Sequence, residues 1–241
     1  MANVMRGHIV ICGWSETARG VIGQLHSEDG DPRRQIVLID PHLEHCPLDD
    51  PYVYFIKGDP TLDETLARAD LKEAETAIVL ADWSIADPGL RDAKSTLTTL
   101  AIENHHPDVY TVVELMRSDN RHHLERADVD EPICVSDLSQ RLLVHAALNH
   151  GLSRFFSSLL RFGEGSEIYK VPLPAALVGK SFRQFVSRAS DAYQAIAVAI
   201  DRVGEIHCNP QGEFTLAAGD QVFLLSEEYP EAFAKNSQAE R

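Results

Sequence analysis

Residues 8–13 read HIVICG, an apolar, largely β-branched run that ends in Gly13, and residues 16–26 follow it with helical spacing. One face of that helix carries Ala18, Val21, Ile22 and Leu25. A buried strand, a glycine turn and an amphipathic helix form the first part of a β-α-β unit. We therefore expect residues 8–26 to open an α/β domain built on a parallel sheet.

The same buried-strand signature recurs before residue 137. The further predicted strands are residues 35–39 (QIVLI), 52–56 (YVYFI), 77–80 (AIVL), 109–113 (VYTVV) and 133–135 (ICV). The helical patterns between them cover residues 62–69, 91–105 and 120–127, and the proline-bracketed residues 41–51 leave room for only a stunted helix. Strict β-α alternation predicts a Rossmann-like, doubly wound parallel sheet with right-handed crossovers.

The pattern changes after residue 137, where two apolar helical stripes are separated by Asn149, His150 and Gly151. The first stripe is Leu138, Leu142, Leu143, Ala146 and Ala147, and the second is Leu152, Phe155, Phe156, Leu159 and Leu160. We expect a helix-turn-helix crossover whose stripes either dock on the chain's own core or form a subunit interface. The interface candidates are Leu142, Phe155, Phe156 and Leu159.

Residues 162–166 (FGEGS) read as a glycine-rich linker to a small α+β module. Its predicted strands are residues 168–171, 195–201, 206–209 and 222–225, with a short helix at 181–187. The predicted organisation is an N-lobe at 1–137, the crossover at 138–163, a C-lobe at 164–229 and a tail at 230–241.

Composition narrows the possible functions. The chain has 241 residues, 44% of them hydrophobic, and 22 Lys and Arg against 37 Asp and Glu give a net charge of −15. Such acidity argues against a nucleic-acid binder and favours cations or basic surfaces as partners. We expect a soluble cytosolic protein for three reasons. The four cysteines are scattered without a CxxC pair, the sequence has no apolar run of membrane length, and it has no signal-peptide pattern.

The turn after the first strand keeps part of a dinucleotide fingerprint. It reads Gly-Trp-Ser-Glu-Thr-Ala, so that only Gly13 of the three glycines remains and Ser15 stands where backbone would approach pyrophosphate. Asp40 ends the second strand, in the position of a carboxylate that binds ribose. Two interpretations stay open: an adenine-nucleotide site at Gly13, Ser15 and Asp40, or a Rossmann-like fold without a nucleotide, in which Ser15 only caps the first helix. The sequence has no catalytic motif, so binding is favoured over turnover.

Several carboxylates are predicted at the carboxyl edge of the sheet, where ligands of open parallel sheets collect. Asp59, Asp82 and Glu114 each follow or end a strand, and Asp87 begins the next helix. Hard cations such as Ca²⁺ take several oxygen ligands of this kind. The alternative is that these acids only cap helices and solvate loops.

Histidines offer a third possibility. His42, His45 and Cys46 have a helical i, i+3, i+4 spacing that would suit zinc or another transition metal, although a second ligand pair is missing. The pairs at 105–106 and 122–123 read as solvent-facing helix residues, with pH sensing as an alternative.

Four segments together resemble a known family: residues 8–16 (HIVICGWSE), 58–61 (GDPT), 77–80 (AIVL) and 219–225 (GDQVFLL). The chain resembles the regulator-of-potassium-conductance (RCK) domain, most closely that of calcium-gated potassium channels of archaea and bacteria. The resemblance implies a Rossmann-like N-lobe, a helix-turn-helix crossover and a C-lobe. It also implies self-assembly, through dimers, into a cytosolic gating ring of commonly eight domains below a tetrameric pore.

In calcium-gated relatives the resemblance implies one main ion site, made by an aspartate ending the fourth strand and two glutamates spaced i, i+2 after the fifth. Glu114 matches the first glutamate, whereas Met116 and Leu80 replace the other two ligands and Asp82 lies two residues further on. We therefore expect a shifted site that uses Asp82 and Glu114, with Gly13, Ser15, Asp40 and Asp59 kept for a nucleotide.

These inferences predict a ligand-sensing domain that couples Ca²⁺ or another cation to pore opening and is not an enzyme. The pore helices would be encoded elsewhere in a longer chain, or the chain would arise from an internal start at Met1 or Met5, and the domain would lie at the inner face of the membrane. The first alternative is the nucleotide-binding regulatory subunit of a Trk- or Ktr-type potassium transporter. The second is an NAD-dependent oxidoreductase, which the damaged fingerprint disfavours.

Overall fold

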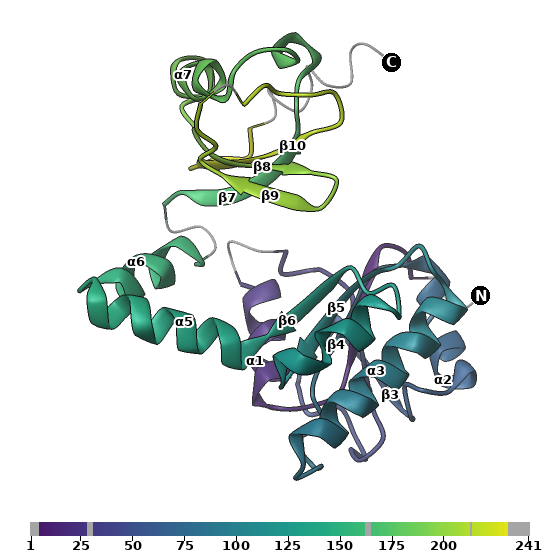
Figure 1. Cartoon of the computed structure of the whole chain (residues 1–241). Helices are drawn as coiled ribbons and strands as arrows, with labels where there is room; N and C mark the ends of the chain where they lie inside the picture. Colours follow the sequence, from purple (N-terminus) through teal and green to yellow (C-terminus); the bar gives the residue numbers. More distant parts are fainter. Residues whose placement is uncertain (1–4, 28–30, 162–164, 213, 231–241) are drawn as a thin grey trace. The chain divides into compact units, whose positions relative to one another are not determined.

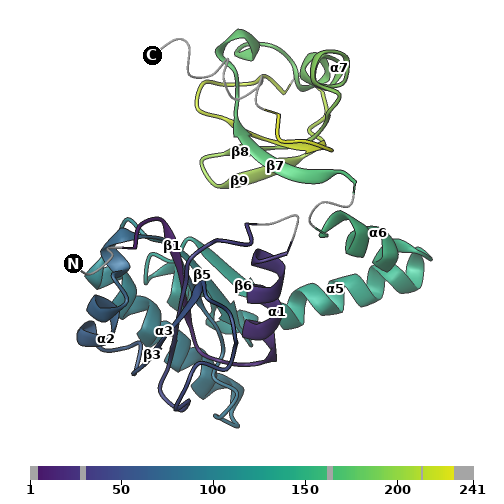
Figure 2. The same cartoon turned by 180° about the vertical axis from the view of Figure 1, so that it is seen from behind.

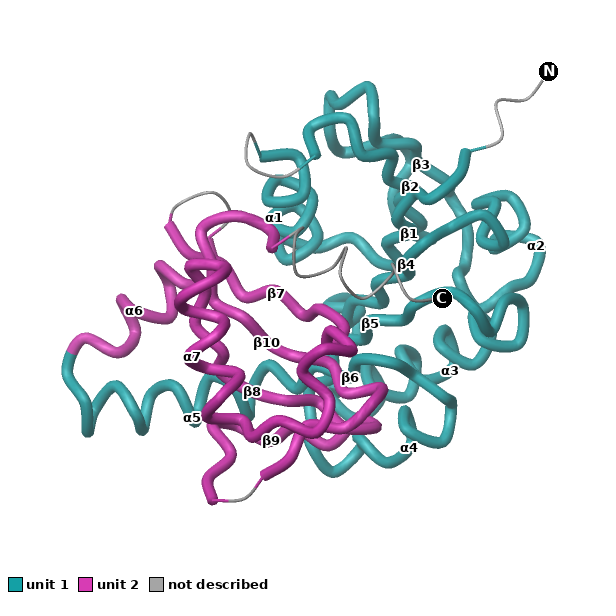
Figure 3. The backbone as a smooth tube through the Cα atoms, turned by 90° about the horizontal axis from the view of Figure 1, so that it is seen from above, with its two compact units in different colours: residues 1–150 teal, residues 151–241 magenta. Residues whose placement is uncertain are grey.

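The computed structural model describes residues 5–27, 31–161, 165–212 and 214–230. It divides into two compact units, residues 1–150 and 151–241, which Figure 3 shows in different colours. The division falls inside the predicted crossover. Most of the predicted linker (162–164) and almost all of the predicted tail (231–241) lie outside the described residues, as does Met1.

Unit 1 contains a six-stranded sheet in the order β3-β2-β1-β4-β5-β6, with every neighbouring pair parallel. The strands are β1 (His8–Cys12), β2 (Ile36–Asp40), β3 (Val53–Lys57), β4 (Ala74–Val79), β5 (Tyr110–Leu115) and β6 (Glu131–Cys134). The direction of winding reverses between β1 and β4, so the carboxyl ends of these two strands mark the topological switch point. The predicted doubly wound, Rossmann-like sheet is confirmed.

Helices cover both faces of this sheet (Figures 1 and 2). They are α1 (Glu16–Leu25), α2 (Asp63–Arg68), α3 (Pro88–His105) and α4 (Arg121–Glu125). Strand residues alternate between two buried clusters: Ile9 and Ile11 pack with Ile22 of α1, whereas Val10 and Cys12 belong to the cluster with α2, α3 and α4. This period of two fixes the register, because a one-residue slip would exchange the two faces.

The structure differs from the sequence prediction at several ends of elements. Residues 41–52 form turns and bends without the stunted helix considered above. Helix α3 begins at Pro88, three residues before the apolar pattern at 91–105, and the prediction that Asp87 begins this helix is confirmed. Asp87 caps it by accepting a hydrogen bond from Leu90 N, and Pro88 suits the first helical position. Helix α5 (Val135–Leu148) follows β6 directly, so residue 135 belongs to the helix and not to the strand.

Unit 2 begins with α6 (Leu152–Leu159) and continues as an antiparallel sheet in the order β7-β10-β8-β9. Its elements are β7 (Glu167–Pro172), α7 (Phe182–Tyr193), β8 (Ile196–Arg202), β9 (Glu205–Cys208) and β10 (Gln221–Ser226). The predicted α+β module is confirmed, but α7 extends six residues beyond the predicted end. The reason is that Ala189 continues the buried face set by Phe182 and Phe185, which packs on the sheet.

Among the described residues, every helix is too short or too polar to cross a membrane.

Candidate functional site

The turn between β1 and α1 is built by one glycine and one cap. Gly13 has φ +101°, a conformation that L side chains rarely adopt, and its N–H donates to Ile39 O at 2.9 Å. Ser15 follows in extended conformation, and its Oγ accepts a hydrogen bond from Ala18 N at 3.3 Å. The capping interpretation of Ser15 is confirmed, and the hydroxyl predicted for a nucleotide already has a partner in the helix.

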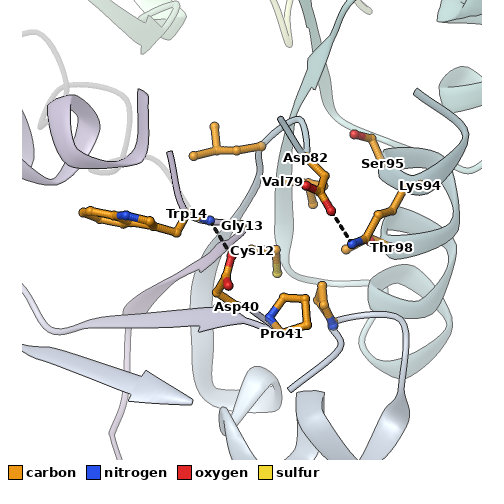
Figure 4. A pocket seen from close by; sticks show the side chains of 12 residues that line it. Cys12, Gly13, Trp14, Asp40, Pro41, Val79, Asp82, Lys94, Ser95 and Thr98 are labelled. Carbon is orange, nitrogen blue, oxygen red and sulfur yellow. Dashed lines mark hydrogen bonds and ion pairs between the residues drawn. The ribbon is translucent and has the colours of Figure 1, made fainter. Parts of the chain in front are cut away.

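Asp40 ties two loops together at the carboxyl edge of the sheet. Its Oδ2 accepts from Trp14 N at 2.9 Å (Figure 4). Its Oδ1 accepts from His42 N at 2.8 Å and from Leu43 N at 3.0 Å. The side chain is buried. This carboxylate therefore holds the turn after β1 against the loop after β2. In a dinucleotide site the same carboxylate would instead face a ribose.

Asp82 lies across the switch point from Asp40 and forms an ion pair with α3. Lys94 Nζ donates to its Oδ2 at 2.6 Å (Figure 4). Ser84 donates to its Oδ1 through N at 2.9 Å and through Oγ at 2.6 Å. Burial alone would raise the pKa of Asp82, but the hydrogen bonds from Lys94 and Ser84 outweigh it and hold the pKa well below its usual range. Asp82 is therefore a carboxylate whose counter-ion comes from the chain itself.

A small cavity lies between these groups. The residues that line it are Cys12, Gly13, Trp14, Asp40, Pro41, Pro60, Val79, Leu80, Asp82, Lys94, Ser95 and Thr98. Its volume is about 20 Å³, enough for about one water molecule. Burial raises the pKa of the Cys12 thiol to about 12, so this group faces the cavity as a neutral thiol. An adenine nucleotide is far larger than this space.

Glu114 lies in a different hollow. It is 7% exposed, its Oε2 accepts from Ala81 N at 2.9 Å, and it lines an open groove of about 590 Å³. The other lining residues are Thr17, Trp83, Pro88, Met116, Arg117, Val135 and Ser136. Asp82 lines the small cavity and not this groove, so the structure does not bring the two predicted calcium ligands to one pocket. Their binding of calcium stays a prediction.

The remaining predicted ligands have structural partners. Asp59 Oδ1 accepts from Thr61 N at 3.0 Å and from Thr61 Oγ1 at 2.8 Å, and its neighbour Pro60 lines the cavity in its place. In the described part of the chain no three His, Cys, Asp or Glu side chains are grouped to hold a metal ion. The zinc hypothesis for His42, His45 and Cys46 is therefore wrong, because residues 42–46 are not helical and the spacing argument fails.

The predicted interface residues lie on helix faces that their own units leave open. Leu142 on α5 is exposed, Phe155 on α6 is 55% exposed, Phe156 is also exposed, and Leu159 is half-buried. The rings of Phe155 and Phe156 meet edge to face at 5.7 Å between centroids. The apolar stripes are thus available for a partner, and their role at a subunit interface stays a prediction.

Sequence reasoning missed a third open face, on α3. Leu90, Leu97 and Leu100 are all exposed there, with Leu97 58% exposed. Their spacing of seven and three residues is the spacing of a helix seam that packs on another helix. That spacing is visible in the sequence and could have revealed this face.

Comparison with known proteins adds the family. Residues 9–135 match the TrkA-N domain, and residues 136–240 match the family described as Castor and Pollux, part of voltage-gated ion channel. The chain belongs to the TrkA-N domain family. The RCK resemblance drawn from the sequence is confirmed by these matches and by the fold.

This TrkA-N protein is similar to the calcium-gated potassium channel TvoK of Thermoplasma volcanium, with 24% identity over 226 residues. That match covers 92% of the chain and 63% of TvoK, so the chain spans less than two thirds of this relative. Among solved structures, the human SLO3 gating ring has the same fold, with a TM-score of 0.73 and 19% identity over 95% of this chain and 46% of that one. The TrkA-N domain of the inner membrane protein ybaL from Escherichia coli matches 58% of this chain and 96% of its own, with 13% identity and a TM-score of 0.50.

Proposed function

We propose that this TrkA-N protein is the ligand-sensing, ring-forming regulatory domain of a potassium channel. One observation carries the proposal: two consecutive matches, to the TrkA-N domain and to an ion-channel domain, account for nearly the whole chain. The similarity to TvoK supports potassium as the conducted ion and a cation as the ligand class.

The mechanism is a linkage between ligand binding and the open or closed conformation of the ring. A ligand shifts a gate only by the difference between its affinities for the open and the closed ring. Moving a gate from 1:99 to 99:1 needs about 5.5 kcal/mol in total. Shared among eight domains, this is about 0.7 kcal/mol for each site, so weak discrimination at each site is sufficient.

Self-association is supported by the three open helix faces. Leu142 on α5, Phe155 and Phe156 on α6 and Leu97 on α3 present apolar surface that solvent would otherwise contact. We infer that copies of the chain pair through α5 and α6. The face on α3 supplies a second, separate contact, and a ring requires two different contacts on each copy.

A cation is a better candidate ligand than a nucleotide. The cavity beside Gly13 has room for about one water, and Ser15 and Asp40 are occupied by backbone N–H groups. Glu114, in contrast, is a mostly buried carboxylate that lines a much larger groove. This difference favours a channel domain over the nucleotide-binding subunit of a Trk- or Ktr-type transporter, which the TrkA-N match keeps as the second candidate.

Binding without catalysis also fits the side chains at the switch point. The acids there are held by backbone N–H groups or by Lys94, and the space between them would not admit a substrate. We propose a non-enzymatic domain on the cytoplasmic side of a membrane pore.

The test is potassium flux from liposomes that hold the full-length gene product or, where the pore is a separate chain, the pore with and without this chain. The proposal requires the chain to change the flux and a cation to modulate that change. Flux that is the same with and without the chain would reject the proposal. Modulation by ATP or ADP, and not by cations, would favour the transporter subunit.

A further inference from the structure

The groove above Glu114 combines a buried charge with apolar walls. Glu114 uses Oε2 to accept the hydrogen bond from Ala81 N, and in the described part of the chain its Oε1 has no hydrogen-bond partner. The side chain is 93% buried, since only 7% is exposed. Oε1 itself is not fully buried, because the described side-chain polar atoms that are both buried and without a partner are His8 Nδ1 and Arg34 Nε. This oxygen therefore keeps contact with solvent at the groove, where a ligand that donates a hydrogen bond or brings a positive charge can reach it.

The walls of the groove determine which cation fits. Trp83, Met116, Pro88 and Val135 contribute an indole ring, a thioether and aliphatic surface, and Glu114 is the one carboxylate among the described lining residues. Calcium takes six to eight oxygen ligands and would find few here. Arg117 also lines the groove, but its guanidinium pairs with Asp119, which leaves Glu114 to face a ligand. A groove with apolar walls and a few polar groups is typical of a site for an amphiphilic organic ligand.

Arg117 in the lining of the groove and Arg91 beside it already have partners. Arg91 lies over the Trp83 ring at 4.1 Å from its centroid and donates to Ile85 O at 2.6 Å. Arg117 forms an ion pair with Asp119 at 3.5 Å. One face of the 52% exposed Trp83 thus already holds a cation, which shows that this indole accepts one.

Local charge favours a further cation. Beside the groove, Asp87 caps α3 and the buried Asp92 accepts hydrogen bonds from Met116 N at 2.8 Å and Arg117 N at 3.1 Å. With Glu114 and Asp119, four carboxylates therefore lie in or near the groove, compared with the guanidinium groups of two arginines. The net charge of −15 adds to this attraction.

We propose that the groove binds an ammonium or guanidinium group carried on an apolar stem, with the charge on Glu114 Oε1 and the stem along Trp83 and Met116. Two sources share this chemistry: a free organic amine, and a Lys or Arg side chain of a second copy of the chain. The inference rests on the proposed function in taking this groove as the ligand site, and it narrows the ligand from cations in general to organic cations.

Trp83 provides the readout. The chain has two tryptophans, so Trp14→Phe leaves Trp83 as the single indole, and its fluorescence reports binding in the groove. The probes are hexylammonium chloride, neutral hexan-1-ol and calcium chloride, each titrated into the Trp14→Phe protein. The test variant is Glu114→Gln, whose amide oxygen still accepts from Ala81 N, and the matched control is Glu125→Gln on the exposed surface of α4.

We expect saturable binding of hexylammonium that weakens at least tenfold in Glu114→Gln and is unchanged in Glu125→Gln, with hexan-1-ol binding more weakly than hexylammonium. Three results would each overturn the inference. They are equal binding of hexan-1-ol and hexylammonium, equal binding of hexylammonium to wild type and Glu114→Gln, and calcium binding that needs Glu114 while hexylammonium does not bind.

The molecular mass of the protein, measured in the same samples, distinguishes the two sources of the cation. An unchanged mass assigns the groove to a free amine, and a fall in mass on adding hexylammonium assigns it to a side chain of a second copy. A wild-type chain that assembles but ignores hexylammonium would refute this inference alone, whereas a chain that never assembles would count against the proposed function.

Discussion

Lys94 Nζ donates a hydrogen bond to Asp82 Oδ2 at 2.6 Å, so an ammonium group of α3 occupies the side of the sheet edge where a bound cation was expected. His42 Nε2 lies 3.7 Å from the same oxygen. The acid just past β4 is therefore neutralised within the chain, and Glu114, at the end of β5, keeps the oxygen that is free for a ligand. The pairing with Lys94 thus distinguishes Asp82 from Glu114, although the two carboxylates belong to neighbouring strands.

Asp82→Asn should lower the free energy of unfolding by about 1.5–3 kcal/mol at pH 7, because it removes charged hydrogen bonds and leaves Lys94 without its partner. The pKa of Asp82 is held below its unfolded value of about 3.9, so the pair stabilises the fold fully above about pH 5. The stabilisation is lost as the pH falls toward the folded pKa. Urea unfolding from pH 4 to pH 8 checks this: the difference between wild type and variant should be constant above pH 6 and shrink below pH 5. The control is Asp119→Asn, which removes an exposed ion pair with Arg117 and should change the free energy of unfolding little. A difference between wild type and Asp82→Asn that grows on acidification would contradict the account.

Gly13→Ala should destabilise the N-lobe by about 1–2 kcal/mol, because φ is +101° and an added Cβ would lie 3.3 Å from Leu80 O. Gly23→Ala, inside α1 with nothing within 4 Å of its added Cβ, should stabilise by about 0.5–1 kcal/mol. Thermal unfolding of both variants makes the comparison. A Gly13→Ala protein as stable as wild type would show that the turn after β1 is not conformationally fixed.

Asp40→Asn should cost about 1–3 kcal/mol, because an amide cannot accept at both ends and its NH₂ would face Trp14 N or the paired N–H groups of His42 and Leu43. Asp59→Asn is the matched control, since one oxygen of Asp59 accepts both hydrogen bonds from Thr61 and an amide oxygen would keep them. Chemical denaturation of the two variants is the measurement. Equal small losses would mean that Asp40 does not clamp the two loops, and would return it to the candidates for ribose binding.

Phe156→Asp should break assembly, because it would place a charge in an apolar contact between copies. Arg154→Asp, on the side of α6 away from the apolar stripe, should leave assembly intact. Sedimentation velocity distinguishes the two: the first variant should sediment as smaller species and the second like wild type. If Phe156→Asp keeps the wild-type mass, α6 is not part of the interface.

The architecture could be predicted from the sequence because strand and helix periods are local. Buried runs such as residues 8–13 and 35–39 admit one arrangement once they alternate with amphipathic helices, and both lie in the sheet as expected. The ends of elements were less predictable. The apolar period of α3 begins only at residue 91, whereas its start is set by the capping hydrogen bond of Asp87, the residue that was expected to begin it. Helix α7 continues because Ala189 packs in the core. Both depend on contacts that periodicity does not encode.

The site was only partly predictable for a related reason. Asp40, Asp82 and Glu114 were correctly located at strand ends, yet their partners decide what each can do. Lys94 lies nearly two turns into α3. Its distance from Asp82 depends on how that helix packs on the sheet. The spacing of Asp82 and Glu114 in the chain gave no sign that they would line different hollows.

The most direct test of the account is the open probability of the intact channel in a planar bilayer, recorded while calcium chloride and then hexylammonium chloride are added on the side that faces the chain. We expect one of these cations to change the open probability in wild type, and Phe156→Asp to abolish the response while single-channel conductance stays the same. An open probability that neither cation changes, or a response that survives removal of residues 8–226, would contradict the account.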